Sequence, residues 1–163
     1  MSAAPVSPTA AGAAPAPTAP ARQVVRLGPP TGGPADLISP AVRYGDLVFV
    51  SGQAGLDPAT MRVVSGDVAD QARAALDQLA AILEAAGTSL GNVLHLECYL
   101  ADAADFATWN GVYAGYFPVD PPARTTLVVG FAVPGMRIEV GAVAAVPGAT
   151  TVAAQPSPRS ASS

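Results

Sequence analysis

The chain has 163 residues, of which 50% are hydrophobic and only 12% are charged, so it fits one folded domain and excludes a fully disordered chain. The net charge is −4 and all eight basic residues are arginine, which argues against a nucleic-acid partner and excludes a lysine Schiff base or a P-loop lysine. One cysteine and one histidine exclude an internal disulfide, are too few for a Cys/His zinc site, and fit a reducing, cytoplasmic compartment.

The two ends of the chain differ in composition from its middle. Residues 1–22 and 147–163 are rich in Ala, Pro and Ser and bury too little surface to offset their ordering entropy, so we expect disordered tails. Residues 23–146 carry a regular pattern and are predicted to form a single domain. No run approaches ~18 uninterrupted apolar residues, so no membrane span is expected.

The first third of the domain contains β-rich runs. Residues 23–27 form a short one, which is followed by glycines and prolines. Residues 47–50 form a second, which ends at Ser51-Gly52-Gln53. Residues 61–64 can return as its hairpin partner, because Asp57-Pro58 between the two runs is a turn signal.

Two helices are predicted further along the chain. Residues 67–86 repeat apolar side chains at i, i+3 and i+4, with Asp67 placed to cap the start and Gly87 following the end. A second helix, capped by Asp102, is predicted to run to about Phe117. The side chains that this helix should turn towards the core are Phe106, Trp109, Tyr113 and Phe117.

Three more strands complete the predicted sheet. Residues 93–100 alternate in polarity, and residues 125–131 and 137–146 are β-rich runs joined at Pro134-Gly135. The element order β-β-α-β-α-β-β predicts an α+β domain in which both helices pack on one face of one sheet. The other face then needs a cover, and another subunit is the simplest one.

Two candidate chemistries can be excluded. His95 and Cys98 are three residues apart on a strand, so their side chains point to opposite faces and form no nucleophilic dyad within one chain. We expect Cys98 to be a buried core residue and His95 to be a partly exposed strand residue. The early glycines fit neither the dinucleotide-binding nor the P-loop pattern.

Two charged residues are candidates for a functional site. Arg124 begins a strand directly after the stiff turn Pro121-Pro122, which lowers the entropy cost of presenting its planar fork to a carboxylate. An arginine in this position is also commonly a solvated or salt-bridged surface residue. Glu139 stands on an otherwise apolar strand face, so it must be paired, exposed at an edge, or functional.

Five short segments, in this order along the chain, resemble the RidA/YjgF family over roughly residues 36–146. They are Ser51-Gly52-Gln53, the helix end from Ala80 to Gly87, Asp105-Phe106-Ala107 with Asn110 and Tyr113, Pro122-Ala123-Arg124-Thr125, and Ile138-Glu139. The resemblance implies a chorismate-mutase-like fold with a mixed sheet, assembled as a homotrimer with sites in the clefts between subunits.

The resemblance also implies an activity, the hydrolysis of reactive enamines and imines such as 2-aminoacrylate to 2-oxo acids and ammonia. No cofactor or metal is then required. Arg124 would hold the substrate carboxylate and Glu139 would position the attacking water, while Ser51 and Asn110 would line the pocket. Water held within ~3 Å of the imine carbon is sufficient chemistry for this reaction.

The sequence departs from the family pattern at three positions. Ile38 stands where many members have tyrosine, Pro40 replaces a glutamine, and Gly141 replaces a second acid. The more apolar wall at Ile38 favours imines with apolar side chains. One alternative is a non-catalytic or pathway-specific trimer that binds small acids and has a biosynthetic or chaperone-like role. The other is the endoribonuclease activity of the family's older label, which fits poorly because the chain is acidic and has no lysine.

Overall fold

A computed structural model describes residues 20–30, 32–57 and 60–148, so most of both predicted tails lies outside the described residues. Arg22, at the edge of the predicted N-terminal tail, already belongs to the first strand. The described strands and α-helices are β1 (Arg22–Val25), β2 (Ala41–Tyr44), β3 (Leu47–Ala54), α1 (Val68–Ala85), β4 (Val93–Leu100), α2 (Phe106–Tyr116), β5 (Ala123–Val128) and β6 (Ile138–Ala145). Short 3-10 helices span Pro34–Leu37, Leu90–Asn92 and Ala103–Asp105.

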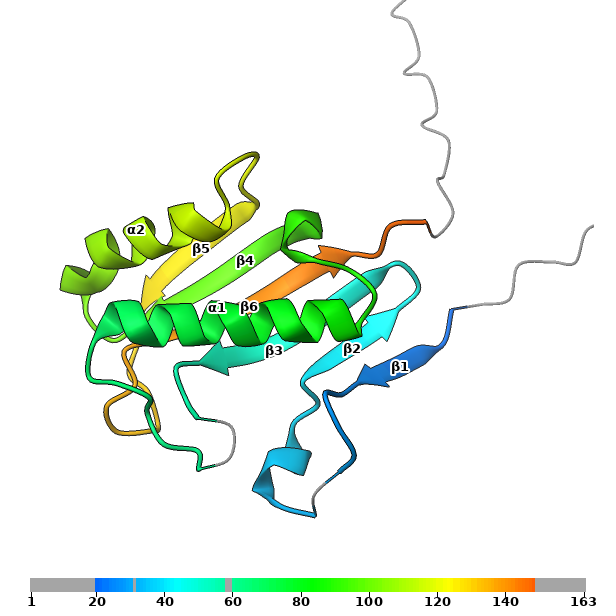
Figure 1. The fold of residues 1–163 in the computed structure, drawn as a ribbon, viewed down its shortest axis with the longest axis horizontal. Helices are drawn as coiled ribbons and strands as arrows, with labels where there is room; N and C mark the ends of the chain where they lie inside the picture. The colour runs from blue at the N-terminus through cyan, green and yellow to red at the C-terminus, as the bar shows by residue number, and fades with distance from the viewer. Residues whose placement is uncertain (1–19, 31, 58–59, 149–163) are drawn as a thin grey trace, which may run out of the picture.

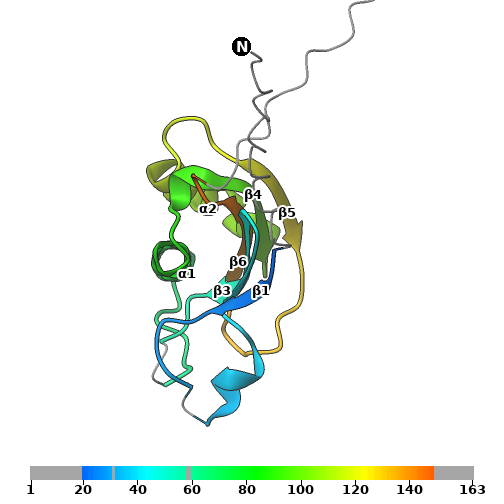
Figure 2. The same cartoon turned by 90° about the vertical axis from the view of Figure 1, so that its right-hand side faces the viewer.

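All six strands form one mixed sheet in the order β1-β2-β3-β6-β4-β5 (Figure 1). The β4–β5 pair is parallel and every other pair is antiparallel. Both helices lie on one face of the curved sheet, and no described helix covers the other (Figure 2). The predicted α+β architecture with two helices on one face is therefore confirmed. Within the described range, no helix has both the length and the hydrophobicity that crossing a membrane requires.

Helix α1 forms as its sequence predicts, to within one residue at each end. The Asp67 side chain caps the start by accepting hydrogen bonds from the backbone N–H groups of Ala69 and Asp70. The helix ends before Gly87, which has a φ of +83° that an L side chain rarely adopts. Its apolar stripe packs on the sheet, with Leu76, Leu79 and Leu83 fully buried.

The predicted hairpin partner of β3 is wrong. Residues 61–64 form no strand, and only an isolated bridge joins Val63 to Leu56. The partner is instead β2, which pairs in register from Tyr44 opposite Leu47 to Ala41 opposite Val50. A two-residue turn links them, and Gly45 adopts the positive φ of +60° that such a tight connection needs.

The start of α2 also differs from the prediction. The Asp102 side chain accepts a hydrogen bond from the Ala104 N–H and so caps a 3-10 turn, after which α2 begins at Phe106. Because Phe106 is the first residue of α2, its side chain remains 45% exposed instead of joining the core. The other three aromatic residues predicted for this core, at positions 109, 113 and 117, are buried.

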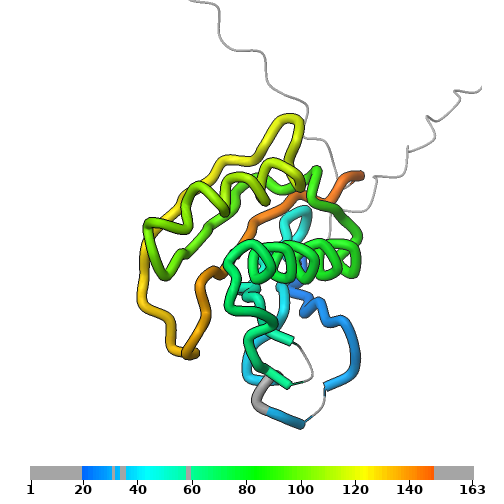
Figure 3. The backbone as a smooth tube through the Cα atoms, turned by 60° about the vertical axis from the view of Figure 1, so that its left-hand side comes forward, coloured from blue at the N-terminus to red at the C-terminus, as the bar shows by residue number. Residues whose placement is uncertain are grey.

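The connection from β5 to β6 is anchored to the start of α1. β5 ends at Val128, three residues before its predicted end. The buried Gln71 side chain donates to the Gly135 carbonyl at 3.0 Å and accepts from the Arg137 N–H at 2.8 Å. In Figure 3 this connection is the wide gold loop that returns to the sheet as β6. The entry of β6, and with it the position of Glu139, is therefore held by a satisfied buried amide.

Candidate functional site

Arg124 lies between β5 and α2, on the helix-covered side of the sheet. Its Nη2 donates to Asn110 Oδ1 at 2.8 Å, so the two residues predicted to share a pocket are in contact. The guanidinium carbon lies 4.4 Å from the centroid of the Tyr113 ring, and 5.9 Å from the Phe106 and Trp109 rings. These rings hold the fork by cation–π attraction.

Arg124 has no carboxylate partner among the described residues. The ion pairs found there are Arg26–Asp36, Arg73–Asp70 and Arg137–Asp105. The guanidinium is half-buried, yet within the described part of the chain its polar partner is only the neutral amide of Asn110. A positioned, partly desolvated arginine with donors to spare is suited to bind a carboxylate from outside the chain.

Glu139 lies on the opposite face of the sheet. Its neighbours along β6, Ile138 and Val140, are fully buried under the helices, so Glu139 points to the uncovered face. A Cβ added at Gly52 would lie only 2.6 Å from the Glu139 carboxyl carbon. The glycine in Ser51-Gly52-Gln53 therefore leaves the space that the Glu139 carboxylate occupies.

Ser51 ties the segment before β2 to this same region. Its hydroxyl donates to the Ser39 carbonyl at 2.7 Å, and its backbone N–H donates to the Pro40 carbonyl at 3.0 Å. The β3–β6 register shifts between Val50 and Gln53, so Ser51 and Gly52 form an irregularity in the strand. Ile38, two residues before Pro40, is 65% exposed.

The predicted site residues thus form two groups in one chain. Arg124 and Asn110 meet on the helix-covered side, whereas Glu139 lies on the uncovered face beside the Ser51-Gly52 irregularity. The sheet separates the two groups, and the chain alone does not bring Arg124 and Glu139 together.

Sequence reasoning missed two polar residues near Glu139. Tyr99 lies opposite Glu139 in the β4–β6 pairing, and its hydroxyl donates to Glu97 Oε2 at 3.0 Å. This hydrogen bond is the main reason that the pKa of Tyr99 is raised, and burial and the charges of Glu97 and Glu139 add to it. The alternation of polar residues at positions 95, 97 and 99 is the signal that could have placed them on one face.

The His95–Cys98 pair forms no dyad, as predicted. Cys98 is 1% exposed on the helix-covered side, and burial raises the pKa of its thiol to about 12, although the Arg124 charge acts in the opposite direction. His95 is partly buried on the other face, where its Nε2 lies 3.4 Å from Thr125 Oγ1. A protonated, buried thiol is not a nucleophile.

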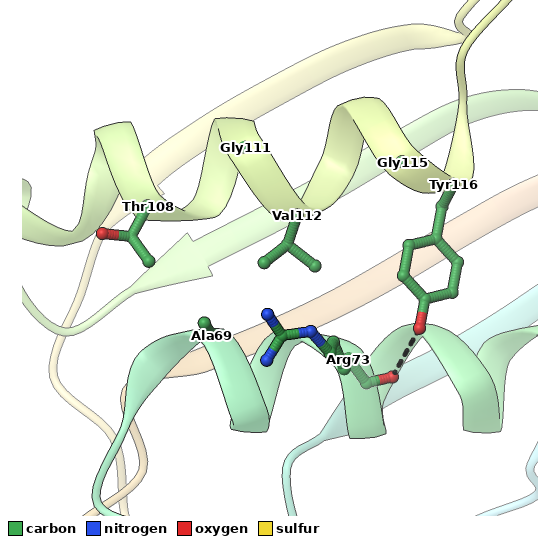
Figure 4. A pocket seen from close by; sticks show the side chains of 7 residues that line it. All are labelled: Ala69, Arg73, Thr108, Gly111, Val112, Gly115 and Tyr116. Atoms are coloured by element: carbon green, nitrogen blue, oxygen red, sulfur yellow. Dashed lines mark hydrogen bonds between the residues drawn. The ribbon is translucent and has the colours of Figure 1, made fainter.

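A hollow of about 460 Å³ lies between α1 and α2 (Figure 4). It is lined by Ala69, Arg73, Thr108, Gly111, Val112, Gly115 and Tyr116. Its charged and phenolic groups are already engaged, because Arg73 pairs with Asp70 at 3.0 Å and the Tyr116 hydroxyl donates to Asp77 at 2.7 Å. None of the predicted site residues lines this hollow, so it is not the candidate site.

Comparisons with known proteins agree with this fold. The family model described as endoribonuclease L-PSP matches residues 33–146. The chain is 43% identical over 106 residues to RutC family protein PH0854 of Pyrococcus horikoshii, covering 65% of this chain and 84% of that protein. It is 42% identical over 106 residues to the human 2-iminobutanoate/2-iminopropanoate deaminase, covering 65% and 77%.

Solved structures of proteins in the same family match this fold. The crystal structure of RidA from a Psychrobacter species matches with a TM-score of 0.67 at 32% identity, covering 76% of this chain and 99% of that one. Rv2704 of Mycobacterium tuberculosis, described as a member of the YjgF/YER057c/UK114 family, matches with a TM-score of 0.66 at 30% identity, covering 77% and 100%. The chain therefore belongs to the RidA/YjgF family, also described as the endoribonuclease L-PSP family.

Proposed function

We propose that this protein hydrolyses reactive enamines and imines that carry a carboxylate, releasing a 2-oxo acid and ammonia. The observation that carries the proposal is Arg124, a half-buried guanidinium oriented by Asn110 and three aromatic rings, without a carboxylate partner among the described residues. The deaminase names of relatives at about 42% identity support it.

In this reaction the enamine first becomes an imine, whose carbon is electrophilic. Water adds to that carbon, the carbinolamine collapses, and ammonia leaves, so that imine plus water gives oxo acid plus ammonia. Glu139 accepts the proton of the attacking water and returns one to the leaving nitrogen. Arg124 fixes the carboxylate so that the imine carbon stays within reach of the water.

The site is shared between two copies of the chain. Arg124 and Glu139 lie on opposite faces of one sheet, so a substrate that touches both needs Arg124 of one copy and Glu139 of another. A second copy would also cover the sheet face that bears Phe49 and Leu127, which are about half exposed. A homotrimer with a site at each interface meets both requirements.

The test is oxo-acid formation from freshly generated 2-aminoacrylate and from larger imines, corrected for spontaneous hydrolysis. Arg124→Lys keeps the charge but not the fork and should lose most of the activity, and Arg124→Ala should lose more. Glu139→Gln should lower turnover more than binding. If folded Arg124→Ala forms product as fast as the parent, the proposal is wrong. If the parent is inactive yet binds a 2-oxo acid through Arg124, the non-catalytic small-acid-binding role replaces it.

A further inference from the structure

Two polar side chains share the uncovered sheet face with Glu139. Tyr99 lies opposite Glu139 on the neighbouring strand, and Glu97 precedes it by two residues on the same face. Glu97 in turn lies opposite Gly141, where an added Cβ would be 3.8 Å from Glu97 Oε2. The Glu97 carboxylate therefore extends over β6, in contact with the space above Gly141.

The phenol of Tyr99 has one proton, which it can donate to one carboxylate at a time. Two glutamates flank Tyr99: Glu97 accepts its hydrogen bond from two residues away on the same strand, and Glu139 is its cross-strand neighbour on β6. In the structure the proton goes to Glu97, at 3.0 Å. The hydroxyl of Tyr99 therefore donates to Glu97 and not to its cross-strand neighbour Glu139.

We propose that Glu97 is a positioning residue: by accepting the Tyr99 proton, it keeps the Glu139 carboxylate free to take a proton from the attacking water. The catalytic consequence rests on the proposed function, whereas the hydrogen bond does not. A hydrogen bond donated to a carboxylate stabilises its charged form and makes it a weaker proton acceptor. Without Glu97, the Tyr99 hydroxyl turns to Glu139 and weakens it as a base.

The first test is a set of turnover measurements on the full-length protein. Glu97→Ala should lower kcat about tenfold, the size expected when one hydrogen bond is redirected onto the base. Glu97→Gln is the matched control, because its amide oxygen still accepts from Tyr99, and it should lose much less. Glu97→Ala combined with Tyr99→Phe should recover the rate of Tyr99→Phe alone, since no donor then remains. A double variant as slow as Glu97→Ala would overturn the proposal.

The second test needs no turnover. Ultraviolet titration of each variant, minus the same variant with Tyr99→Phe, isolates the ionisation of Tyr99. In Glu97→Ala the pKa of Tyr99 should stay above the ordinary value for tyrosine, because Glu139 becomes the acceptor, and it should drop when Glu139→Gln is added. A drop to the ordinary value in Glu97→Ala alone would overturn the proposal. A parent that is inactive would refute the proposed function, and the titration would still decide whether Glu97 keeps Tyr99 from Glu139.

Discussion

Mixed oligomers provide the sharpest test of a site divided by the sheet. Arg124→Ala and Glu139→Gln each remove one half, and both homo-oligomers should be nearly inactive. Arg124 contacts α2, whereas Glu139 faces the uncovered side, so the two losses fall on different faces of one chain. An interface that takes Arg124 from the Glu139→Gln copy and Glu139 from the Arg124→Ala copy is intact, so mixing should restore activity.

The size of the recovery can be worked out. A bidentate charge-assisted pair is worth roughly 1.5–3 kcal/mol, so Arg124→Ala should lower kcat/KM by about 10- to 150-fold. In a random one-to-one mixture, about a quarter of the interfaces of a cyclic oligomer are intact, since each side has an even chance of the native residue. A random mixture should therefore reach about a quarter of the parent activity, and tandem-purified mixed trimers, each with one intact interface out of three, should reach about a third.

The assay uses two affinity tags, co-expression and tandem purification, followed by oxo-acid release from freshly generated imine. Oligomers that carry both tags but only Arg124→Ala copies serve as the control and should stay inactive. If purified mixed oligomers show no recovery, the shared-site reasoning is refuted, because either both residues then act within one chain or one of them does not act.

Three further predictions concern single residues. Gly52→Ala should displace the Glu139 carboxylate and lower kcat by about 10- to 100-fold. The thermal midpoint should change little, because the displaced group is the end of a flexible side chain. Unchanged turnover would contradict the steric argument. Arg137→Ala should lower the free energy of unfolding in urea by about 2 kcal/mol, because it leaves the Asp105 carboxylate, which is 6% exposed, without its charged partner. The 39% exposure of Arg137 limits the loss, and Arg137→Lys should lose less. An unchanged urea midpoint in Arg137→Ala would show that the ion pair is dispensable for stability. Iodoacetamide at pH 8 should modify Cys98 at least about 100-fold more slowly than free cysteine, because a pKa of about 12 keeps its thiol protonated. The modification rate should rise with pH. Fast modification of the folded protein would show that the thiol is accessible and would contradict this prediction.

The regular elements were predictable because their local signals agree with the tertiary structure. Asp67 caps α1, its apolar stripe faces the core, and Val93–Leu100 is a strand with the predicted bounds. The missed strand β2 had a signal of its own, since Gly45-Asp46 between two β-rich runs is typical of a two-residue hairpin. The Asp57-Pro58 turn signal competed with it. A turn signal shows where the chain reverses but not which two runs pair.

The candidate site was less predictable, for physical reasons. The sequence and the resemblance named Arg124 and Glu139 as candidates, but not that they lie on opposite faces of the sheet. That depends on the parallel pairing of β5 with β4, which sets Arg124 opposite Leu96 on the helix-covered side. The role of Gly52 was equally hidden, because a close approach between β3 and β6 leaves no mark in either strand alone.

The two halves of the proposed site share a property that bears on catalysis. Arg124 is held by Asn110 and the ring of Tyr113, and Glu139 sits in the space that Gly52 leaves, so each charged group is oriented by its own chain before any substrate binds. Little side-chain entropy then remains to be lost on binding. The remaining variable is the distance between the halves, which the packing of two copies sets. A rigid interface would make the site a preformed slot for a short carboxylate-bearing imine, and its length would follow from how the two sheets pack and not from movement of either residue.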